Sequence, residues 1–219
     1  MALQLYYHPL SSYCWKVLIA LYENDTPFER RMLEEPGVGE EWMALWPIGR
    51  FPVLRDDDRV IAEASVIVEY LAMKTPGSFR PIPTDPDAAM EVRMMDRLFD
   101  NYVMTPMQTM VFDKVRPDGA NRDPYGVEQA KGLLAKAYAL IEDRIGGRIW
   151  AAGDDFSLAD CAALPALYFS DYILPFRTDH PCLSAYIARL EPRPSIARVL
   201  AEMQPWFHNF PFADAKAGA

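Results

Sequence analysis

Cysteine and histidine are scarce in this chain, which has three of each among its 219 residues. The cysteines Cys14, Cys161 and Cys182 are odd in number and far apart, which excludes a disulfide framework and favours reduced thiols in a cytoplasm. The histidines show no metal-ligand spacing with one another or with the cysteines. We therefore expect neither a structural zinc site nor any other resident metal.

Long hydrophobic runs and an excess of basic charge are missing as well. The longest apolar stretches are broken by Asp160, Pro165 and Asp171, so none reaches the ~18 residues of a membrane helix. The first ten residues have neither the basic nor the apolar region of a secretory signal. A net charge of −9 argues against a nucleic-acid partner. The 51% of hydrophobic residues is enough for the core of one or two domains.

The first 75 residues alternate between strand and helix patterns. We expect strands over 3–7, 28–33, 51–54 and 59–62, and helices over 12–24, over 40–46 and from 66 onwards. The order βαβαββα predicts parallel pairing at its start, because a strand–helix–strand unit crosses over the sheet. The short connection at 56–58 predicts an antiparallel hairpin at the edge of a mixed sheet.

The rest of the chain has helical patterns and no strand-like runs. Residues 75–87 contain four prolines and no periodicity, which is typical of a linker. Helices are expected over 88–114, 124–145, 157–172, 182–190 and 194–203. The predicted fold class is α/β plus all-α, with an α/β domain at 1–76, a linker at 77–87 and a helical domain at 88–219. One helix start is well specified, because Ser157 and Asp160 form a capping-box variant.

The segment HPLSSYCWKV, residues 8–17, resembles a C-x-x-C redox site whose first cysteine is a serine. Ser11 or Ser12 lies at a helix N-terminus, where a hydroxyl can donate to a bound thiolate and lower the pKa of that thiol. The alternative is a serine that only caps the helix, and one serine can do both. Cys14 lies one turn further on, where it suits a small core position.

Two later segments suit the polar ends of a ligand. In WPIGRFPVL, residues 46–54, Pro52 opens a strand predicted to lie at the sheet edge, where free backbone groups can pair with an extended peptide. The alternative is a tight turn into such a strand. In EASVIVEYL, residues 63–71, Glu63 and the free N–H groups of a helix start suit the ammonium and carboxylate of an amino acid. The alternative is an ordinary helix cap.

These segments, in this order and followed by the linker and the helix start FSLAD, resemble the glutathione S-transferase family over nearly the whole chain. WPIGRFPVL resembles the pattern N-P-x-G-x-V-P-x-L, with Trp46 for Asn and Phe51 for Val. EASVIVEYL resembles E-S-x-A-I-x-x-Y-L, with Ala64 for the serine. The resemblance implies a thioredoxin-like N-terminal domain, a C-terminal helical bundle, glutathione as cosubstrate and a homodimer.

The resemblance also implies a role for individual residues. The Phe51–Pro52 bond is expected to be cis, with the Phe51 backbone paired to the cysteinyl part of glutathione. Arg50 is expected to contact the glycine carboxylate, and Glu63 to hold the γ-glutamyl end. Ser65 replaces the missing family serine only if its hydroxyl or its backbone N–H turns to the same carboxylate.

Four side chains are candidates for contact with the glutathione sulfur. SSYCWKVLIAL resembles the first helix of the serine-type theta, tau and zeta classes, which implies that Ser11 activates the thiol. Ser12 ranks second among the candidates and Tyr7 third. Tyr7 matches the position used by tyrosine-type classes, but its ring could equally be packed in the core. Cys14 comes last.

The predicted function is therefore a glutathione transferase that prepares the thiol for attack on an apolar electrophile, as in detoxification. The alternatives are a zeta-like isomerase or dehalogenase that uses glutathione, and a non-catalytic member that binds glutathione or a protein. A thiol–disulfide oxidoreductase is less favoured, because the chain has no C-x-x-C pair. The electrophile pocket is expected between the domains, with the candidates Tyr102, Met107, Met110 and Phe112, and packing in the helical core is the favoured role for most of these four. The aromatic tail at 205–212 is expected to cover either this pocket or the first domain.

Overall fold

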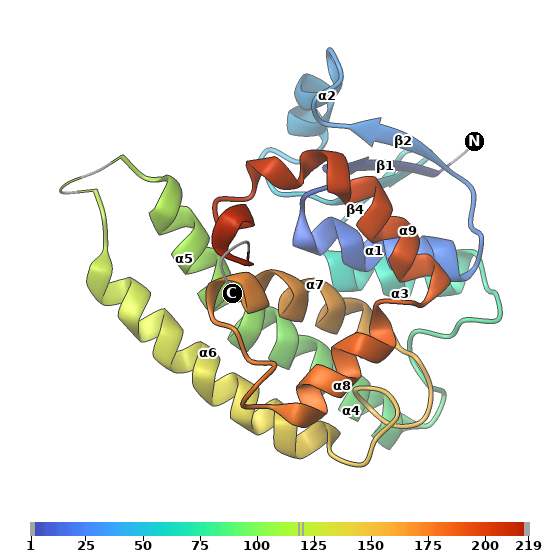
Figure 1. Ribbon diagram of the computed structural model, residues 1–219. Coiled ribbons are helices and arrows are strands. Elements are labelled where there is room, and N and C mark those ends of the chain that lie inside the picture. The colour runs from blue at the N-terminus through green and yellow to red at the C-terminus, as the bar shows by residue number, and fades with distance from the viewer. Residues whose placement is uncertain (1–2, 118, 120, 217–219) are drawn as a thin grey trace.

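The computed structural model describes residues 3–117, 119 and 121–216, so the first two and last three residues of the predicted domains lie outside it. Figure 1 shows the sheet with its helices above a larger group of helices. The N-terminal half contains, in chain order, β1 (Leu3–Tyr7), α1 (Ser12–Glu23), β2 (Phe28–Met32), α2 (Val38–Leu45), β3 (Val53–Asp56), β4 (Arg59–Ala62) and α3 (Ala64–Lys74). The predicted order βαβαββα is confirmed.

The sheet is mixed, with the strand order β2-β1-β3-β4. β1 and β2 are parallel, with Leu5 opposite Arg30, and α1 connects them. β3 is antiparallel to both β1 and β4. The prediction that the strand after Pro52 lies at an edge is wrong, because β1 and β4 flank β3. Pro52 lies just before Val53, the first paired residue of β3, so its missing N–H leaves no gap in the ladder.

The elements described in the C-terminal half are all helices, joined by loops. This half contains α4 (Pro86–Leu98), η1 (Phe99–Met104), α5 (Thr105–Val115), α6 (Pro124–Ile145), α7 (Leu158–Ile173), α8 (Pro181–Leu190), α9 (Pro194–Met203), η2 (Gln204–Asn209) and η3 (Ala213–Lys216). The helix expected over 88–114 is α4, the π-helical η1 and α5 without a break. In η1 the Thr105 N–H donates to the Asp100 carbonyl, five residues back. Pro106 has no N–H for an α-helical bond, and the wider π turn accommodates it.

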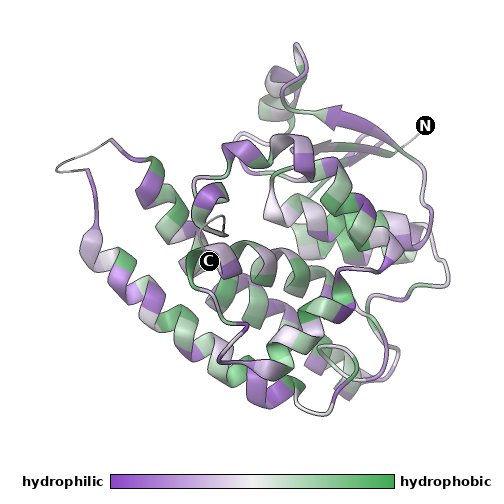
Figure 2. Cartoon of the chain, viewed as in Figure 1, coloured by the Kyte–Doolittle hydropathy of each residue, from purple (hydrophilic) through white to green (hydrophobic). Residues whose placement is uncertain are grey.

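One continuous core extends from the sheet through α1 into the helical half. α1 packs against α3, α7 and α9, and Figure 1 shows it in the middle of the molecule. Trp15 of α1 is fully buried, with its ring centroid 4.7 Å from that of Phe169 in α7. Figure 2 shows α7 as mostly apolar, in agreement with its run of buried small and aliphatic side chains. No helix in the described part of the chain is long and apolar enough to cross a bilayer.

The linker and α9 are both attached to the end of α1. The Asn24 amide group donates to the Phe79 carbonyl at 3.0 Å and accepts from the Phe79 N–H at 2.9 Å. A Cβ atom at Gly77 would lie 2.2 Å from the Asn24 Oδ1, so this close approach requires glycine. The Glu23 carboxylate accepts two bonds from the Arg193 guanidinium, at 2.7 and 2.6 Å. These contacts fix how the two halves face each other.

α7 begins as the sequence predicts. Ser157 and Asp160 form a capping box, in which Asp160 accepts from the Ser157 N–H at 2.8 Å. The same buried carboxylate accepts from the Ala151 N–H at 2.9 Å and from the Tyr186 hydroxyl at 2.6 Å. Burial raises the pKa of Asp160, and its hydrogen bonds oppose this shift. Asp160 therefore connects the start of α7 to α8 and to the loop that precedes α7.

We predict that Asp160→Ala lowers the free energy of unfolding by about 3 kcal/mol or more, because several buried donors lose their acceptor at ~1–3 kcal/mol each. Urea unfolding followed by circular dichroism measures the change. Asp154→Ala, at an exposed residue of the same loop, is the control and is expected to stay within about 0.5 kcal/mol of wild type. A loss below about 1 kcal/mol for Asp160→Ala would contradict this role.

Candidate functional site

The loop over 8–11 connects β1 to α1 and ends at Ser11. Ser11 is the N-cap of α1: its backbone is extended, and its Oγ accepts from the Cys14 N–H at 3.4 Å. Because the oxygen acts as acceptor in this bond, the cap does not use the hydroxyl hydrogen; the same hydroxyl also contacts the buried Cys14 thiol. The first N–H groups of α1 have no intrahelical acceptors, which gives this end of the helix a partial positive charge.

A cavity of about 660 Å³ lies between the two halves, and Ser11 is in its wall. The N-terminal half contributes the β1–α1 loop, the segment before β3 and the start of α3. The C-terminal half contributes α4, η1, α5, α7 and the tail. Of the predicted site residues, the cavity wall includes Ser11, Ser12, Arg50, Phe51, Pro52 and Glu63.

The segment before β3 is held by α2. The Trp42 Nε1–H donates to the Arg50 carbonyl at 3.1 Å, and the Trp42 ring meets the Phe51 ring edge-on at 5.5 Å. The Phe51–Pro52 peptide bond is cis, as expected. Phe51 precedes the first ladder residue of β3, so its backbone groups lie outside the β1–β3 ladder. This segment can therefore offer backbone groups and the exposed Arg50 guanidinium to a ligand.

Glu63 immediately precedes α3 and has an exposed side chain. Its φ of 70° and ψ of 115° are unusual for a residue other than glycine and indicate local strain. Its carbonyl accepts the first helical bond, from the Ile67 N–H at 2.9 Å. The N–H groups of Ala64 and Ser65 come before this bond and have no α-helical acceptor. A carboxylate and a helix N-terminus thus lie side by side in the cavity wall.

Ser65 does not line the cavity. Its hydroxyl accepts from the Lys16 ammonium at 2.8 Å and donates to Asp96 at 3.0 Å. The Arg97 guanidinium also donates to it. The hydroxyl is therefore engaged between α3 and α4, which leaves the backbone N–H as the group that Ser65 can offer to a ligand.

Two of the four candidates for the sulfur contact lie outside the cavity wall. Tyr7 is buried, and the Arg30 guanidinium donates to its hydroxyl at 3.5 Å. Burial raises the pKa of Tyr7, with Arg30 opposing. Cys14 is fully buried, and burial raises its pKa to about 12, so the thiol stays protonated at neutral pH. Ser11 and Ser12 are the candidates that the cavity wall contains.

A buried charged cluster that the sequence analysis did not predict lies beside the cavity. The Lys16 side chain is 1% exposed, and its ammonium contacts Asp96 and lies 2.8 Å from Asp100. The Arg97 guanidinium pairs with the same two carboxylates. Asp100 and Arg97 are both in the cavity wall. The available signals were a lysine among the apolar residues of its helix and two aspartates four residues apart, on one helix face.

Comparison with known proteins agrees with this arrangement. Residues 5–79 match the family model of the glutathione S-transferase N-terminal domain, and residues 124–189 match that of the C-terminal domain. The chain belongs to the glutathione S-transferase family. Glutathione S-transferase F6 of Arabidopsis thaliana is 27% identical over 210 residues, which cover 90% of this chain and 99% of that protein.

Two solved structures of glutathione S-transferases are similar to this one. The enzyme from Methylobacterium radiotolerans, in complex with glutathione sulfonate, is 28% identical with a TM-score of 0.79, covering 91% of this chain and 94% of that chain. The enzyme from Methylobacillus flagellatus, with glutathione bound, is 26% identical with a TM-score of 0.81, covering 90% and 98%. The mixed sheet followed by helices is therefore the thioredoxin-like and helical pair of glutathione S-transferase domains.

In this glutathione S-transferase, α5, α7 and the tail line the other side of the cavity with uncharged residues. Met107 and Phe112 lie in the wall, as predicted. Tyr102 and Met110 do not: Tyr102 is exposed to solvent at 51%, and Met110 is buried in the core, which is the role expected for most of these residues.

The aromatic tail of the transferase takes both of its expected positions. Phe210 lines the cavity, and its ring packs 5.1 Å from that of Phe169 in α7. Trp206 meets the His8 ring edge-on at 5.0 Å, next to the loop that carries Ser11. The tail therefore closes one side of the cavity and contacts the first domain.

We predict that iodoacetamide labels Cys182 in the folded transferase and leaves Cys14 and Cys161 unmodified. Glu142 raises the pKa of Cys182, but this thiol is exposed to the reagent. The other two are fully buried and burial raises their pKa values, so they are inaccessible and form almost no reactive thiolate. Mass spectrometry of protein labelled with and without denaturant measures this. Labelling of Cys14 in the native protein would contradict it, and Cys14→Ala is expected to keep its conjugating activity.

Proposed function

We propose that this transferase activates the thiol of glutathione as a thiolate through the Ser11 hydroxyl and directs it at an apolar electrophile. The observation that carries the proposal is that Ser11 caps α1 inside the cavity wall through its oxygen, so the cap does not use its hydroxyl hydrogen. The hydroxyl donates to the sulfur, and the positive end of α1 adds to the stabilisation of negative charge. Both effects lower the pKa of the bound thiol from its usual ~8.5.

The cavity wall offers groups that match each part of glutathione. We propose that Arg50 pairs with the glycine carboxylate and that the backbone of Phe51, next to Pro52, pairs with the cysteinyl part. Glu63 then faces the γ-glutamyl ammonium, while the free N–H groups at the start of α3 bind the carboxylate beside it. Ser65 contributes its backbone N–H, because its hydroxyl is bonded within the Lys16 cluster.

Among the sulfur candidates, Ser11 is favoured over Ser12 and Tyr7. Ser12 is the first helical residue of α1 and is 7% exposed, so its hydroxyl is less accessible to a ligand. Tyr7 lies outside the wall, and its raised pKa does not favour a phenolate. Ser12 is the second candidate, because it lines the same cavity one residue further on.

The electrophile is proposed to bind against α5, α7 and the tail. The described residues that these elements place in the wall are uncharged: Met107, Gln108, Val111, Phe112, Val115, Phe169, Asn209, Phe210 and Pro211. Such a surface suits an apolar or aromatic electrophile, whose carbon forms a bond to the glutathione sulfur while its bond to the leaving group breaks and that group departs as an anion. It suits a dicarboxylate less well, so a maleyl-compound isomerase is the less favoured alternative despite the zeta-like segment at Ser11 and Ser12.

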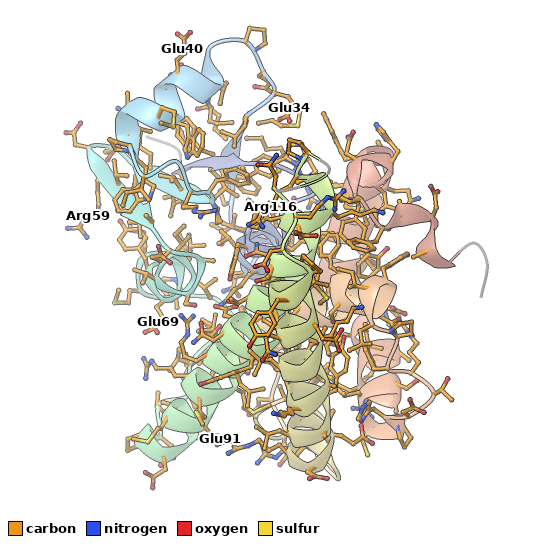
Figure 3. The ribbon with its side chains drawn as sticks, turned by 90° about the vertical axis from the view of Figure 1, so that its left-hand side faces the viewer. Glu34, Glu40, Arg59, Glu69, Glu91 and Arg116 are labelled. Atoms are coloured by element: carbon orange, nitrogen blue, oxygen red, sulfur yellow. The ribbon has the colours of Figure 1, made fainter. Side chains whose placement is uncertain are left out.

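We also propose that the enzyme acts as a homodimer in a reducing cytoplasm. Apolar side chains remain exposed on neighbouring helices, namely Val66 and Met73 on α3 and Met90 and Met94 on α4. Glu69 of α3, labelled in Figure 3, accepts two hydrogen bonds from Arg93 of α4 and so connects these helices. All three cysteines are free thiols, as a reducing compartment requires. Detoxification is the role that such conjugation serves.

We predict that Ser11→Ala lowers kcat/KM for conjugation of glutathione with 1-chloro-2,4-dinitrobenzene by about 100-fold or more, because one donor to the developing thiolate is lost. The spectrophotometric pKa of the bound thiol is expected to rise in the same variant. Ser12→Ala is the matched control, with a smaller loss. Full activity of Ser11→Ala would refute the assignment of Ser11, and no turnover by wild type with this electrophile or with maleylpyruvate would favour a non-catalytic member.

We predict that Arg50→Ala raises the Kd for glutathione about tenfold or more, because a charge-assisted contact contributes ~1.5–3 kcal/mol. Isothermal titration calorimetry measures this change. Arg59→Ala is the control, since Arg59 is exposed on β4, as Figure 3 shows, and is not part of the cavity wall. Equal affinities for wild type and Arg50→Ala would contradict the proposed contact.

A further inference from the structure

The ring of His8 lies behind the loop over 8–11, outside the described wall of the cavity. Its side chain is 15% exposed. On one side, the His8 Nε2 lies 3.0 Å from the Oε1 of Glu34, which projects from the β2–α2 connection (Figure 3). On another side, Trp206 of the tail meets the ring edge-on at 5.0 Å. Three separate segments therefore meet at this one imidazole.

The hydrogen bonds of His8 require a neutral ring. Its Nδ1 accepts from the Leu10 N–H at 3.0 Å, and a ring nitrogen that accepts a bond carries no proton. The proton is therefore on Nε2, which donates it to Glu34. A second proton, on Nδ1, would face the Leu10 N–H and remove the bond between them.

The bond to Leu10 shapes the stretch that ends at Ser11. The Ser11 N–H donates to the His8 carbonyl at 3.0 Å, and the Trp15 Nε1–H donates to the Pro9 carbonyl at 2.6 Å. Leu10 and Ser11 both lie in the cavity wall. The imidazole thus holds the residue directly before Ser11, while the His8 backbone holds Ser11 itself.

We propose that His8 is a positioning residue for the transferase reaction, and that its neutral ring sets the place of the Ser11 hydroxyl through the Leu10 N–H. This inference rests on the proposed function, because it takes Ser11 as the residue that contacts the sulfur. It also gives the tail a part in catalysis, since Trp206 limits the motion of the His8 ring. A catalytic group displaced by ~1 Å costs up to about 100-fold in rate.

The pKa of His8 makes this positioning dependent on pH. Burial lowers the pKa below its ordinary value of 6.5, and Glu34 opposes the shift. Among the described residues, Glu34 is the charged group found facing the ring, while the tail presents the uncharged Trp206. A group whose pKa is lowered by folding gives its full contribution above ~6.5 and loses it as the pH falls through the lowered value. His8 therefore holds the loop at neutral pH and releases it in acid.

The pH profile of His8→Asn tests this role. Asparagine keeps an acceptor oxygen at the position of Nδ1 but does not titrate. The ratio of wild-type to His8→Asn kcat/KM, measured with glutathione and 1-chloro-2,4-dinitrobenzene, cancels the ionisation of the thiol that both proteins share. We expect this ratio to be constant above pH ~6.5 and to fall at lower pH as one proton binds to wild type. A ratio that does not depend on pH would overturn the proposal.

Two further variants separate positioning from folding. His8→Ala has no acceptor, so its kcat/KM is expected to be about tenfold or more below that of His8→Asn at neutral pH, where both proteins are uncharged at this position. His208→Asn makes the same chemical change at an exposed histidine of the tail and is expected to leave the profile of wild type unchanged. Equal activities of His8→Ala and His8→Asn would overturn the proposal.

Nuclear magnetic resonance tests the same geometry without turnover. The Leu10 amide shift is expected to titrate with the midpoint of the His8 ring, and Glu34→Gln is expected to move both midpoints to lower pH, because the Glu34 carboxylate raises the His8 pKa. A Leu10 amide that stays constant while His8 titrates would overturn the proposal. Full activity of Ser11→Ala would instead refute the assignment of Ser11, and absence of turnover by wild type would refute the proposed transferase. These outcomes are distinct because every His8 measurement uses protein that retains Ser11.

Discussion

The buried ammonium of Lys16 is the interaction on which the two halves of this transferase depend. Lys16 lies in α1, and its partners are Ser65 of α3, Asp96 of α4 and Asp100 of η1. Removing one partner from such a buried cluster costs about 3–5 kcal/mol, because the remaining charges stay buried without compensation. The sheet domain and the helical domain are thus joined by charge as well as by the apolar core.

The same cluster determines which groups reach the cavity. It takes up the Ser65 hydroxyl, and it holds Asp100 and Arg97 where they line the wall. The charged residues of the wall consequently lie on the segment before β3, at the start of α3, and on α4 and η1. The walls from α5, α7 and the tail are uncharged. This division gives one cavity two chemically different parts, one charged and one uncharged.

Features fixed by neighbouring residues could be predicted from the sequence. The capping box of Ser157 and Asp160 starts α7 at the predicted place, because both partners are within one helical turn. The alternation of strand and helix patterns predicted the mixed sheet. The proline-rich residues 75–87 predicted the connection that separates α3 from α4. The prediction that β3 lies at a sheet edge was wrong. Proline is compatible both with an edge strand and with the position just before any strand, and the local sequence around Pro52 does not distinguish the two.

The site shows the same division between local and tertiary information. The sequence by itself determined that a serine caps α1, that a carboxylate precedes α3 and that Arg50 precedes Phe51 and Pro52, because each of these depends on chain neighbours. Only the tertiary structure decided that Ser11 and Ser12 line the cavity while Tyr7 and Cys14 do not. It also decided that the Ser65 hydroxyl meets Lys16 and that His8 meets Glu34 and Trp206. These contacts join residues from separate segments, and the packing of α1 between the domains sets the distances between them.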